Sequence, residues 1–185
     1  EKMRIDGFEN LKIENLQNRL RIEIPKIEIQ LKDLEDKIRI GYGFDRIAPV
    51  YDLMNRVMTA GLDGRWRKLA VREVVWPGDR VLDSCCGTGD LAVEAERRGG
   101  LVVGLDFSEP MLERARRKSG TIEWVQGDAL ALPFDDGSFA AVTVGFGVRN
   151  LDDLEGGLRE AARVLRPGGK IAVLEITRPR GLLRP

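Results

Sequence analysis

The sequence contains no histidine among its 185 residues. This absence excludes Ser-His-Asp hydrolysis, zinc sites built on histidine and acid–base catalysis by an imidazole. Cysteine is nearly absent too, because only Cys85 and Cys86 occur, and two adjacent thiols are too few and too close for a disulfide framework or a metal site. Any reaction at this chain is therefore expected to need little proton transfer from the protein and no bound metal.

Long apolar runs and an excess of one charge are also missing. Lysine plus arginine and aspartate plus glutamate number 30 each, so the chain lacks the basic surface of a nucleic-acid-binding protein. No apolar run approaches the length of a membrane span, and no signal peptide is visible. With 43% hydrophobic residues the chain can still bury one core. We therefore expect a cytoplasmic protein with one α/β domain and an appendage.

A glycine turn between a strand pattern and a helical pattern is the most informative feature that is present. The turn is the run Asp83 to Asp90, DSCCGTGD. Gly87 and Gly89 can adopt backbone angles closed to other residues, and the free N–H groups at a helix start attract an anionic or nucleotide-like ligand. The spacing differs from the dinucleotide fingerprint G-x-G-x-x-G, which disfavours NAD. It resembles the first motif of class I S-adenosylmethionine methyltransferases, whose loop binds the methionine end of the cofactor.

Acidic residues end the strand patterns that follow. Asp106 lies 23 residues after Asp83, close to the spacing at which a carboxylate on the second strand binds ribose hydroxyls. Asp128 follows the third pattern, where a side-chain acceptor can meet an adenine amino group. Each aspartate alone is a common turn residue. Three of them in register with a glycine turn favour a ligand at the carboxyl ends of a parallel sheet.

Strand and helix patterns alternate through residues 78–178. This alternation predicts a Rossmann-like α/β fold, with a mostly parallel sheet and helices on both faces. Ser108 is placed to cap a helix, and Pro167-Gly168-Gly169 is expected to stop the last one. The predicted strands are 80–84, 101–105, 121–126, 140–145 and 170–176, and the predicted helices are about 90–98, 109–118 and 152–165.

Six blocks carry a more specific pattern: 51–55 (YDLMN), 81–91 (VLDSCCGTGDL), 105–112 (LDFSEPML), 131–139 (ALPFDDGSF), 145–150 (GFGVRN) and 164–169 (VLRPGG). Together they resemble the ubiquinone/menaquinone biosynthesis C-methyltransferases over about residues 44–179. The resemblance implies S-adenosylmethionine as cofactor and a prenylated hydroquinone as methyl acceptor. The cofactor-binding residues expected from the motif and the resemblance are Asp83, Gly87, Thr88, Gly89, Asp106, Asp128, Ala129 and Gly145.

The same resemblance implies that Tyr51, Arg149 and Asn150 lie near the acceptor as catalytic residues. Methyl transfer suits a chain without histidine, because the sulfonium of the cofactor is already an activated leaving group. Arg149 can stabilise the phenolate of a deprotonated hydroquinone, although guanidinium is a poor general base, and Asn150 can orient a water that takes the proton. The alternative is that Arg149 pairs with Asp152 or Asp153 and only stabilises the turn.

The two ends of the chain depart from the family. The family continues beyond the fifth strand, so we expect this methyltransferase domain, residues 41–185, to lack the final strands of the sheet. Residues 1–40 have no counterpart in the family and form the expected appendage. Their apolar residues alternate before Pro25, which favours a strand, and follow heptad spacing after Ile27, which favours a helix. We expect this segment to cover the sheet edge or to pair with a second copy as a homodimer.

Residues 61–75 mix apolar and basic side chains. This composition suits either a helix packed on its own domain or a peripheral contact at the inner face of the membrane, where a prenylated substrate resides. Three functions remain open on the sequence: a quinol C-methyltransferase, a methyltransferase of the same fold with another small-molecule acceptor, and a cofactor-binding protein without catalysis.

Overall fold

The structure is a computed structural model that describes residues 21, 23, 25, 26 and 51–175. The chain divides into two compact units, Glu1–Tyr42 and Gly43–Pro185. The helices of the second unit are α2 (Tyr51–Met58), α3 (Asp63–Val74), α4 (Asp90–Arg97), α5 (Glu109–Lys118) and α6 (Leu154–Val164), with the 3-10 helix η1 (Val148–Asn150). Its strands are β1 (Arg80–Ser84), β2 (Leu101–Asp106), β3 (Glu123–Gln126), β4 (Phe139–Gly145) and β5 (Leu165–Leu174).

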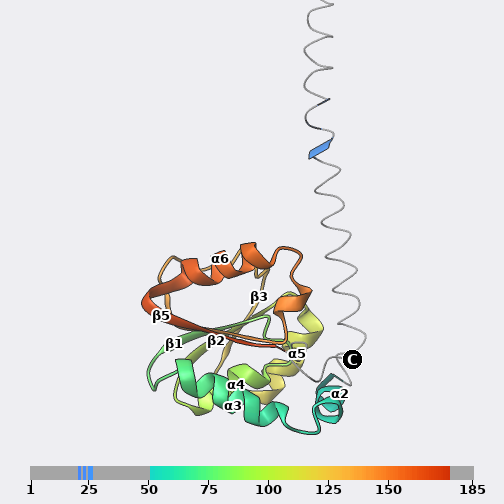
Figure 1. The fold of residues 1–185 in the computed structure, drawn as a ribbon, viewed down its shortest axis with the longest axis vertical. Helices are drawn as coiled ribbons and strands as arrows, with labels where there is room; N and C mark the ends of the chain where they lie inside the picture. Colours follow the sequence, from blue (N-terminus) through green and yellow to red (C-terminus); the bar gives the residue numbers. More distant parts are fainter. Residues whose placement is uncertain (1–20, 22, 24, 27–50, 176–185) are drawn as a thin grey trace, which may run out of the picture. The chain divides into compact units, whose positions relative to one another are not determined.

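The described strands form one parallel sheet in the order β3-β2-β1-β4-β5 (Figure 1). The chain runs outward from β1 to β3 and then returns to the other side of β1 at β4. The strand order therefore reverses between β1 and β4, and open sheets bind ligands beside the carboxyl ends of strands at such a point. Asp83 of β1 and Thr143 of β4 are register partners there. The α/β fold class predicted from the alternating pattern is confirmed.

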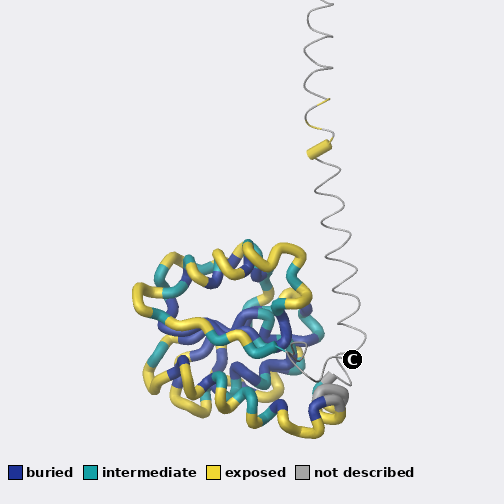
Figure 2. The backbone as a smooth tube through the Cα atoms, in the orientation of Figure 1, coloured by how far each residue is buried: buried dark blue, intermediate teal, exposed yellow. Residues whose placement is uncertain are grey.

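The two faces of the sheet are covered by different helices. Helices α3 and α4 lie on one face and α6 on the other, while α5 runs beside β2 and β3 (Figure 1). Val81 contributes to the core under α3 and α4, and the next residue, Leu82, contributes to the core under α6. Both faces of β1 are thus apolar, as expected of a parallel strand covered on both sides. Figure 2 shows these central strands mostly in dark blue, the colour of buried residues.

The predicted cap at Ser108 and the predicted end of the last helix are confirmed, but the predicted start of the last strand, residue 170, is wrong. Ser108 caps α5 by accepting a hydrogen bond from the Met111 N–H at 3.4 Å. Helix α6 ends at Val164, before the Pro-Gly-Gly sequence, and β5 begins at once with Leu165. Leu165 pairs with Phe139 of β4, and the register then shifts to resume at Lys170. The Pro-Gly-Gly sequence therefore forms an irregularity within a strand, because pairing with β4 outweighs the local turn signal.

The few described residues of the first unit correct another expectation. Arg21, Glu23, Pro25 and Lys26 have α-helical backbone, so the strand expected before Pro25 is wrong at Arg21 and Glu23. Lys26 Nζ lies 3.2 Å from Glu23 Oε1, an i, i+3 pair that matches helical spacing. The remainder of the alternating and heptad patterns, and the edge-covering and dimer roles expected of residues 1–40, fall outside the described residues.

Gly104 gives a testable prediction about the sheet beneath the site. A Cβ added there would lie 2.4 Å from Cζ3 of Trp124, and one added at Gly89 would lie 2.5 Å from Cη2 of the same ring. The ring is also held by a 3.1 Å hydrogen bond from Nε1 to the Ser119 carbonyl. Gly104→Ala should therefore lower the free energy of unfolding by about 1–3 kcal/mol, measured by urea denaturation.

Two further variants make this prediction specific. Gly104→Ala should cost much less stability in a Trp124→Leu background than in wild type, because the smaller side chain leaves room for the new methyl group. Gly120→Ala is the matched control, since nothing lies within 4 Å of the place that its new methyl group would occupy. Additive losses in the double variant would show that the Gly104 contact with Trp124 is not the cause.

Candidate cofactor and active site

The glycine loop leaves β1 through a strained turn and ends at the first residue of α4. Gly87 and Gly89 have φ values of +55° and +81°, and Cys85 has φ of +55° although it carries a side chain. A left-handed backbone costs a non-glycine residue roughly 1–2 kcal/mol. Such strain is typical of functional loops. Cys86 N–H bonds to the Leu105 carbonyl at 2.9 Å, which holds the loop against the end of β2.

Asp106 joins this loop to the start of α5. One carboxylate oxygen accepts the Gly87 N–H at 2.7 Å, and the other accepts the Ser108 N–H at 2.9 Å. The carboxylate predicted to bind ribose hydroxyls thus lies at the end of β2, in direct contact with the glycine loop.

Asp83 is a carboxyl group buried at the strand-order reversal. Its Oδ1 accepts a 2.7 Å hydrogen bond from the Thr143 hydroxyl of the neighbouring strand. Its Oδ2 has no hydrogen-bond partner among the described residues. Burial raises the pKa of Asp83 to about 7, and the nearby charge of Asp106 adds to the shift. A buried acceptor in this position suits a ligand that brings a positively charged donor.

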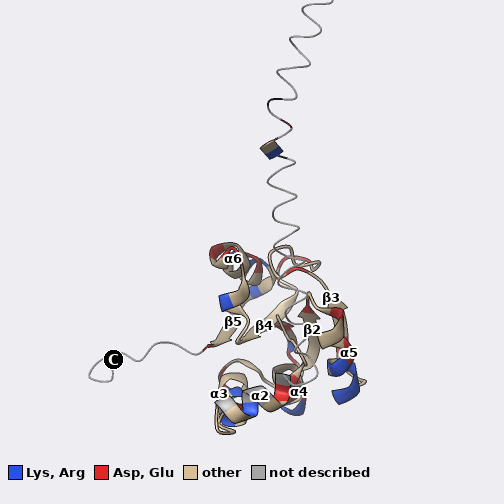
Figure 3. Ribbon diagram, turned by 90° about the vertical axis from the view of Figure 1, so that its right-hand side faces the viewer, with Lys and Arg blue, Asp and Glu red and all other residues tan. Residues whose placement is uncertain are grey.

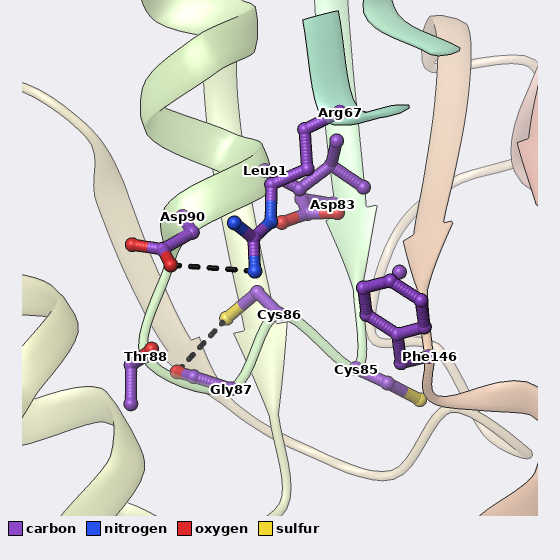
Figure 4. Close-up of a pocket in the computed structure, with 10 residues that line it drawn as sticks. Arg67, Asp83, Cys85, Cys86, Gly87, Thr88, Asp90, Leu91 and Phe146 are labelled. Carbon is purple, nitrogen blue, oxygen red and sulfur yellow. Dashed lines mark hydrogen bonds and ion pairs between the residues drawn. The ribbon is translucent and has the colours of Figure 1, made fainter. Parts of the chain in front are cut away.

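The pocket beside Asp83 brings together four of the expected cofactor residues. Asp83, Gly87, Thr88 and Gly145 line it, with Arg67, Cys85, Cys86, Asp90, Leu91 and Phe146 (Figure 4). Gly89 forms the N-cap of α4 next to this lining, with φ of +81°. The structure therefore places the glycine loop, the buried carboxyl group and the end of β4 around one pocket.

Asp128 and Ala129 lie outside that lining, after β3. The Asp128 carboxylate accepts the Leu130 N–H at 2.9 Å, which is the local turn that the sequence also allowed. Ala129 is buried. Their proposed contact with an adenine ring would extend the site from the pocket across the ends of β2 and β3.

Thr88 belongs to a charged network that the sequence did not reveal. Its hydroxyl donates to Asp52 Oδ1 at 2.5 Å and accepts from Lys118 Nζ at 3.0 Å. Lys118 also lies 2.6 Å from both Asp52 and Asp90. Figure 3 shows acidic and basic residues side by side around α4 and α5. Helix α2, which carries the YDLMN block and starts at Tyr51, is connected to the glycine loop by these contacts.

Arg149 lies on η1, beyond the pocket, with its side chain half exposed. Its guanidinium is 3.0 Å from Glu175 Oε1, and Nε donates to the Phe146 carbonyl at 3.4 Å. The alternative partners Asp152 and Asp153 are wrong, since Asp153 caps α6 through the Gly156 N–H at 2.8 Å and the described ion pair of Arg149 is with Glu175. Asn150 ends η1 and is exposed. The GFGVRN block therefore contributes Gly145 and Phe146 to the pocket lining and places Arg149 next to Phe146, outside that lining.

The two thiols allow a prediction about the loop. Burial raises the pKa of Cys85 to about 12, and it raises that of Cys86 well above the ordinary value, with Asp106 adding to both shifts. Because the thiolate is the reactive form, native Cys85 and Cys86 should react with a maleimide far more slowly than in urea. Bound S-adenosylhomocysteine should slow the reaction further. Modification at the same rate in native and unfolded protein would contradict the burial of this loop.

Comparison with known proteins gives the chain its relatives. A family model described as the ubiE/COQ5 methyltransferase family matches residues 31–183. A demethylmenaquinone methyltransferase of Thermus thermophilus is 49% identical over 74% of this chain and 65% of its own length. A 2-phytyl-1,4-naphtoquinone methyltransferase of Synechococcus elongatus is 44% identical over 74% of this chain and 63% of its own length. The chain thus spans a little less than two thirds of these relatives.

Solved structures of methyltransferases have a similar fold. A SAM-dependent methyltransferase of Thermotoga maritima, a possible histamine N-methyltransferase, has a TM-score of 0.60 at 28% identity, covering 72% of this chain and 60% of the other. A putative S-adenosyl-L-methionine-dependent methyltransferase of Methanococcus maripaludis has a TM-score of 0.63 at 22% identity, covering 70% and 62%. The family and fold expected from the sequence are confirmed, and S-adenosylmethionine is the cofactor that this family and fold indicate.

Proposed function

The chain belongs to the ubiE/COQ5 methyltransferase family, and we propose that it transfers a methyl group from S-adenosylmethionine to a ring carbon of a prenylated hydroquinone such as demethylmenaquinol. The buried Asp83 carboxyl group beside the glycine loop is the observation that carries the cofactor assignment. The acceptor assignment is supported by two relatives, which are named as methyltransferases of demethylmenaquinone and of 2-phytyl-1,4-naphtoquinone.

The site fits the chemistry of this cofactor. S-adenosylmethionine supplies an activated methyl group on a sulfonium and carries an ammonium group, which is the donor that Asp83 Oδ2 lacks. Asp106, whose carboxylate accepts the Gly87 and Ser108 backbone N–H groups, would also bind the ribose hydroxyls. Positive φ at Gly87 and Gly89 lets the loop turn closely around a ligand. Asp128 would then bind the adenine amino group.

The acceptor is proposed to react at the rim of this pocket. Arg149 is held by Glu175 while half of its side chain stays exposed, so its charge can lie beside a hydroquinone oxygen. A fixed cation there stabilises the phenolate that makes the neighbouring ring carbon nucleophilic. The proton would leave through water oriented by Asn150, because guanidinium stays protonated. Tyr51, at the start of α2, is proposed to contact the acceptor.

Contact with a membrane surface is proposed through α3. Val71 and Val74 are buried against the domain, whereas Leu62 and Leu69 are 43% and 52% exposed. The helix therefore packs on its own sheet and still presents apolar side chains to the outside. None of the described helices is long and apolar enough to cross a membrane, so such a contact would be peripheral. Binding of the protein to anionic vesicles, lost in Leu62→Ser and Leu69→Ser, tests it.

One experiment tests the function as a whole. S-adenosylhomocysteine is titrated by calorimetry, and a short-chain demethylmenaquinol analogue is then assayed with S-adenosylmethionine under reducing conditions. We expect saturable binding and methylation of the ring carbon. Binding without turnover on this or a panel of other small acceptors would favour a non-catalytic cofactor-binding protein. Absence of binding would contradict the proposal.

Asp106→Asn tests the ribose contact. The amide keeps one acceptor oxygen but loses the charge, so we expect S-adenosylmethionine binding to weaken by about 1.5–3 kcal/mol. Calorimetry measures this change, and circular dichroism checks that the loop-to-α5 contacts still allow folding. Asp135→Asn, an exposed residue of the turn before β4, is the matched control. Unchanged affinity in folded Asp106→Asn would rule out the ribose assignment.

A further inference from the structure

Arg67 enters the cofactor pocket from α3, an element that carries none of the residues predicted for the site. Its side chain is 12% exposed, which is unusual for arginine. Figure 4 shows its guanidinium directed toward Asp83 and the glycine loop. Arg67 also lines a second cavity of about 260 Å³ between α2, α3 and the end of α5. Arg67 therefore contributes to the walls of both cavities.

Two acidic side chains orient the guanidinium without using all of its donors. One terminal nitrogen lies 2.6 Å from Asp63 Oδ2, and the other lies 3.4 Å from Asp90 Oδ2. Asp63 itself is fixed by a 3.0 Å hydrogen bond from the Thr59 hydroxyl. An arginine has five N–H donors, so these two contacts leave several of them for a ligand.

Arg67 and Asp83 present opposite charges to the same pocket. Arg67 attracts the Asp83 carboxylate and opposes the rise of its pKa. Still, no ion pair joins the two within the described part of the chain, and Asp83 Oδ2 has no hydrogen bond. A pocket with a cation on one wall and a lone acceptor on another complements a ligand end that carries both an ammonium and a carboxylate, which is the chemistry of an α-amino acid.

We propose that Arg67 binds the carboxylate of the amino-acid end of S-adenosylmethionine while Asp83 binds its ammonium group. This assignment rests on the proposed function and deepens it. A planar guanidinium can give two parallel hydrogen bonds to a carboxylate, which fixes the direction in which the amino-acid end lies. Arg67 would thereby make the protein bind the cofactor more tightly than adenosine derivatives that lack a carboxylate.

The test compares two ligands that differ only in the carboxylate. Dissociation constants are measured by calorimetry for S-adenosylhomocysteine and for its decarboxylated form, S-adenosyl-3-thiopropylamine. The proteins are wild type, Arg67→Gln, Arg67→Lys and the control Arg65→Gln, which changes an exposed arginine two residues away on the same helix. The measured quantity is the affinity ratio of the two ligands in each protein, because partial unfolding lowers both affinities together and leaves the ratio unchanged.

We expect wild type and Arg65→Gln to bind S-adenosylhomocysteine on the order of 10- to 100-fold more tightly than the decarboxylated ligand. In Arg67→Gln the ratio should fall to about one to three, and in Arg67→Lys it should be intermediate, because the ammonium keeps the charge without the planar pair of donors. A ratio in Arg67→Gln equal to that of wild type would overturn the proposal. Arg67 would then only connect α3 to α4 through its ion pair with Asp90. Wild type that binds neither ligand would instead contradict the cofactor assignment.

Discussion

Asp83→Asn should make the protein more stable, relative to wild type, as the pH rises. Burial raises the pKa of Asp83 to about 7 from the ordinary 3.8, so between these values the folded protein keeps a proton that the unfolded chain has released. The stability of the wild type therefore falls as pH rises through this window. Asparagine does not titrate. The difference in unfolding free energy between variant and wild type should thus grow by about 4 kcal/mol from pH 4 to pH 8.

Urea denaturation at one-unit pH intervals measures this difference. Its pH dependence is more informative than its absolute size, because an asparagine amide without a partner adds a penalty that does not vary with pH. The Thr143 hydroxyl can still donate to the Oδ1 of asparagine, so the link between β1 and β4 is retained. Stability curves of wild type and variant that stay parallel from pH 4 to pH 8 would show that Asp83 is not buried as a perturbed acid.

Asp83→Asn should also weaken the binding of the cofactor. At pH 8 the wild type presents a charged carboxylate to the ammonium group, whereas asparagine presents a neutral amide. Wild-type affinity for S-adenosylhomocysteine should therefore increase from pH 6 to pH 8, and the affinity of Asp83→Asn should stay lower and nearly constant. A carboxylate that costs folding energy and is needed for binding is what a functional site is expected to contain.

Local patterns were sufficient for most of the fold. The strand patterns of β1, β2 and β4 and the cap at Ser108 depend on residues that are adjacent in the sequence, and each was predicted within about two residues. The start of β5 was not. Pro167 and the two glycines after it predict a turn. Only the pairing of Leu165 with Phe139 of β4 shows that the strand has already begun.

In the site, too, local features could be predicted from the sequence, and features that depend on tertiary packing could not. The glycine loop and the acidic strand ends could be found because they follow one another in the sequence at regular strand ends. Arg67 could not, because it lies before β1 and reaches the pocket only when α3 packs beside α4. The partner of Arg149 was missed for a related reason. The Phe146 N–H bonds to the Leu174 carbonyl at 2.8 Å, which brings Glu175 to η1 from the end of β5.

Arg149→Ala should lower the rate of methyl transfer by about 10²- to 10³-fold, which is the usual effect of removing one fixed donor to a developing oxyanion. Affinity for S-adenosylhomocysteine should change less than about threefold, because Arg149 lies outside the pocket lining. Single-turnover assays with the demethylmenaquinol analogue measure the rate, and calorimetry measures the affinity. Arg159→Ala, which removes an exposed arginine of α6, is the matched control.

The pH profile separates an electrostatic role of Arg149 from a structural one. A phenolic hydroxyl ordinarily has a pKa near 10, and a cation beside the hydroquinone lowers it so that the nucleophilic phenolate forms near neutral pH. Without Arg149 the phenolate requires a higher pH, so the rate of Arg149→Ala should rise steeply toward pH 10 and approach that of wild type. Arg149→Lys should show a smaller shift, because it keeps the charge. If Arg149 only anchors η1 to Glu175, the variant should lose stability and cofactor affinity, and its remaining rate should follow the wild-type pH profile.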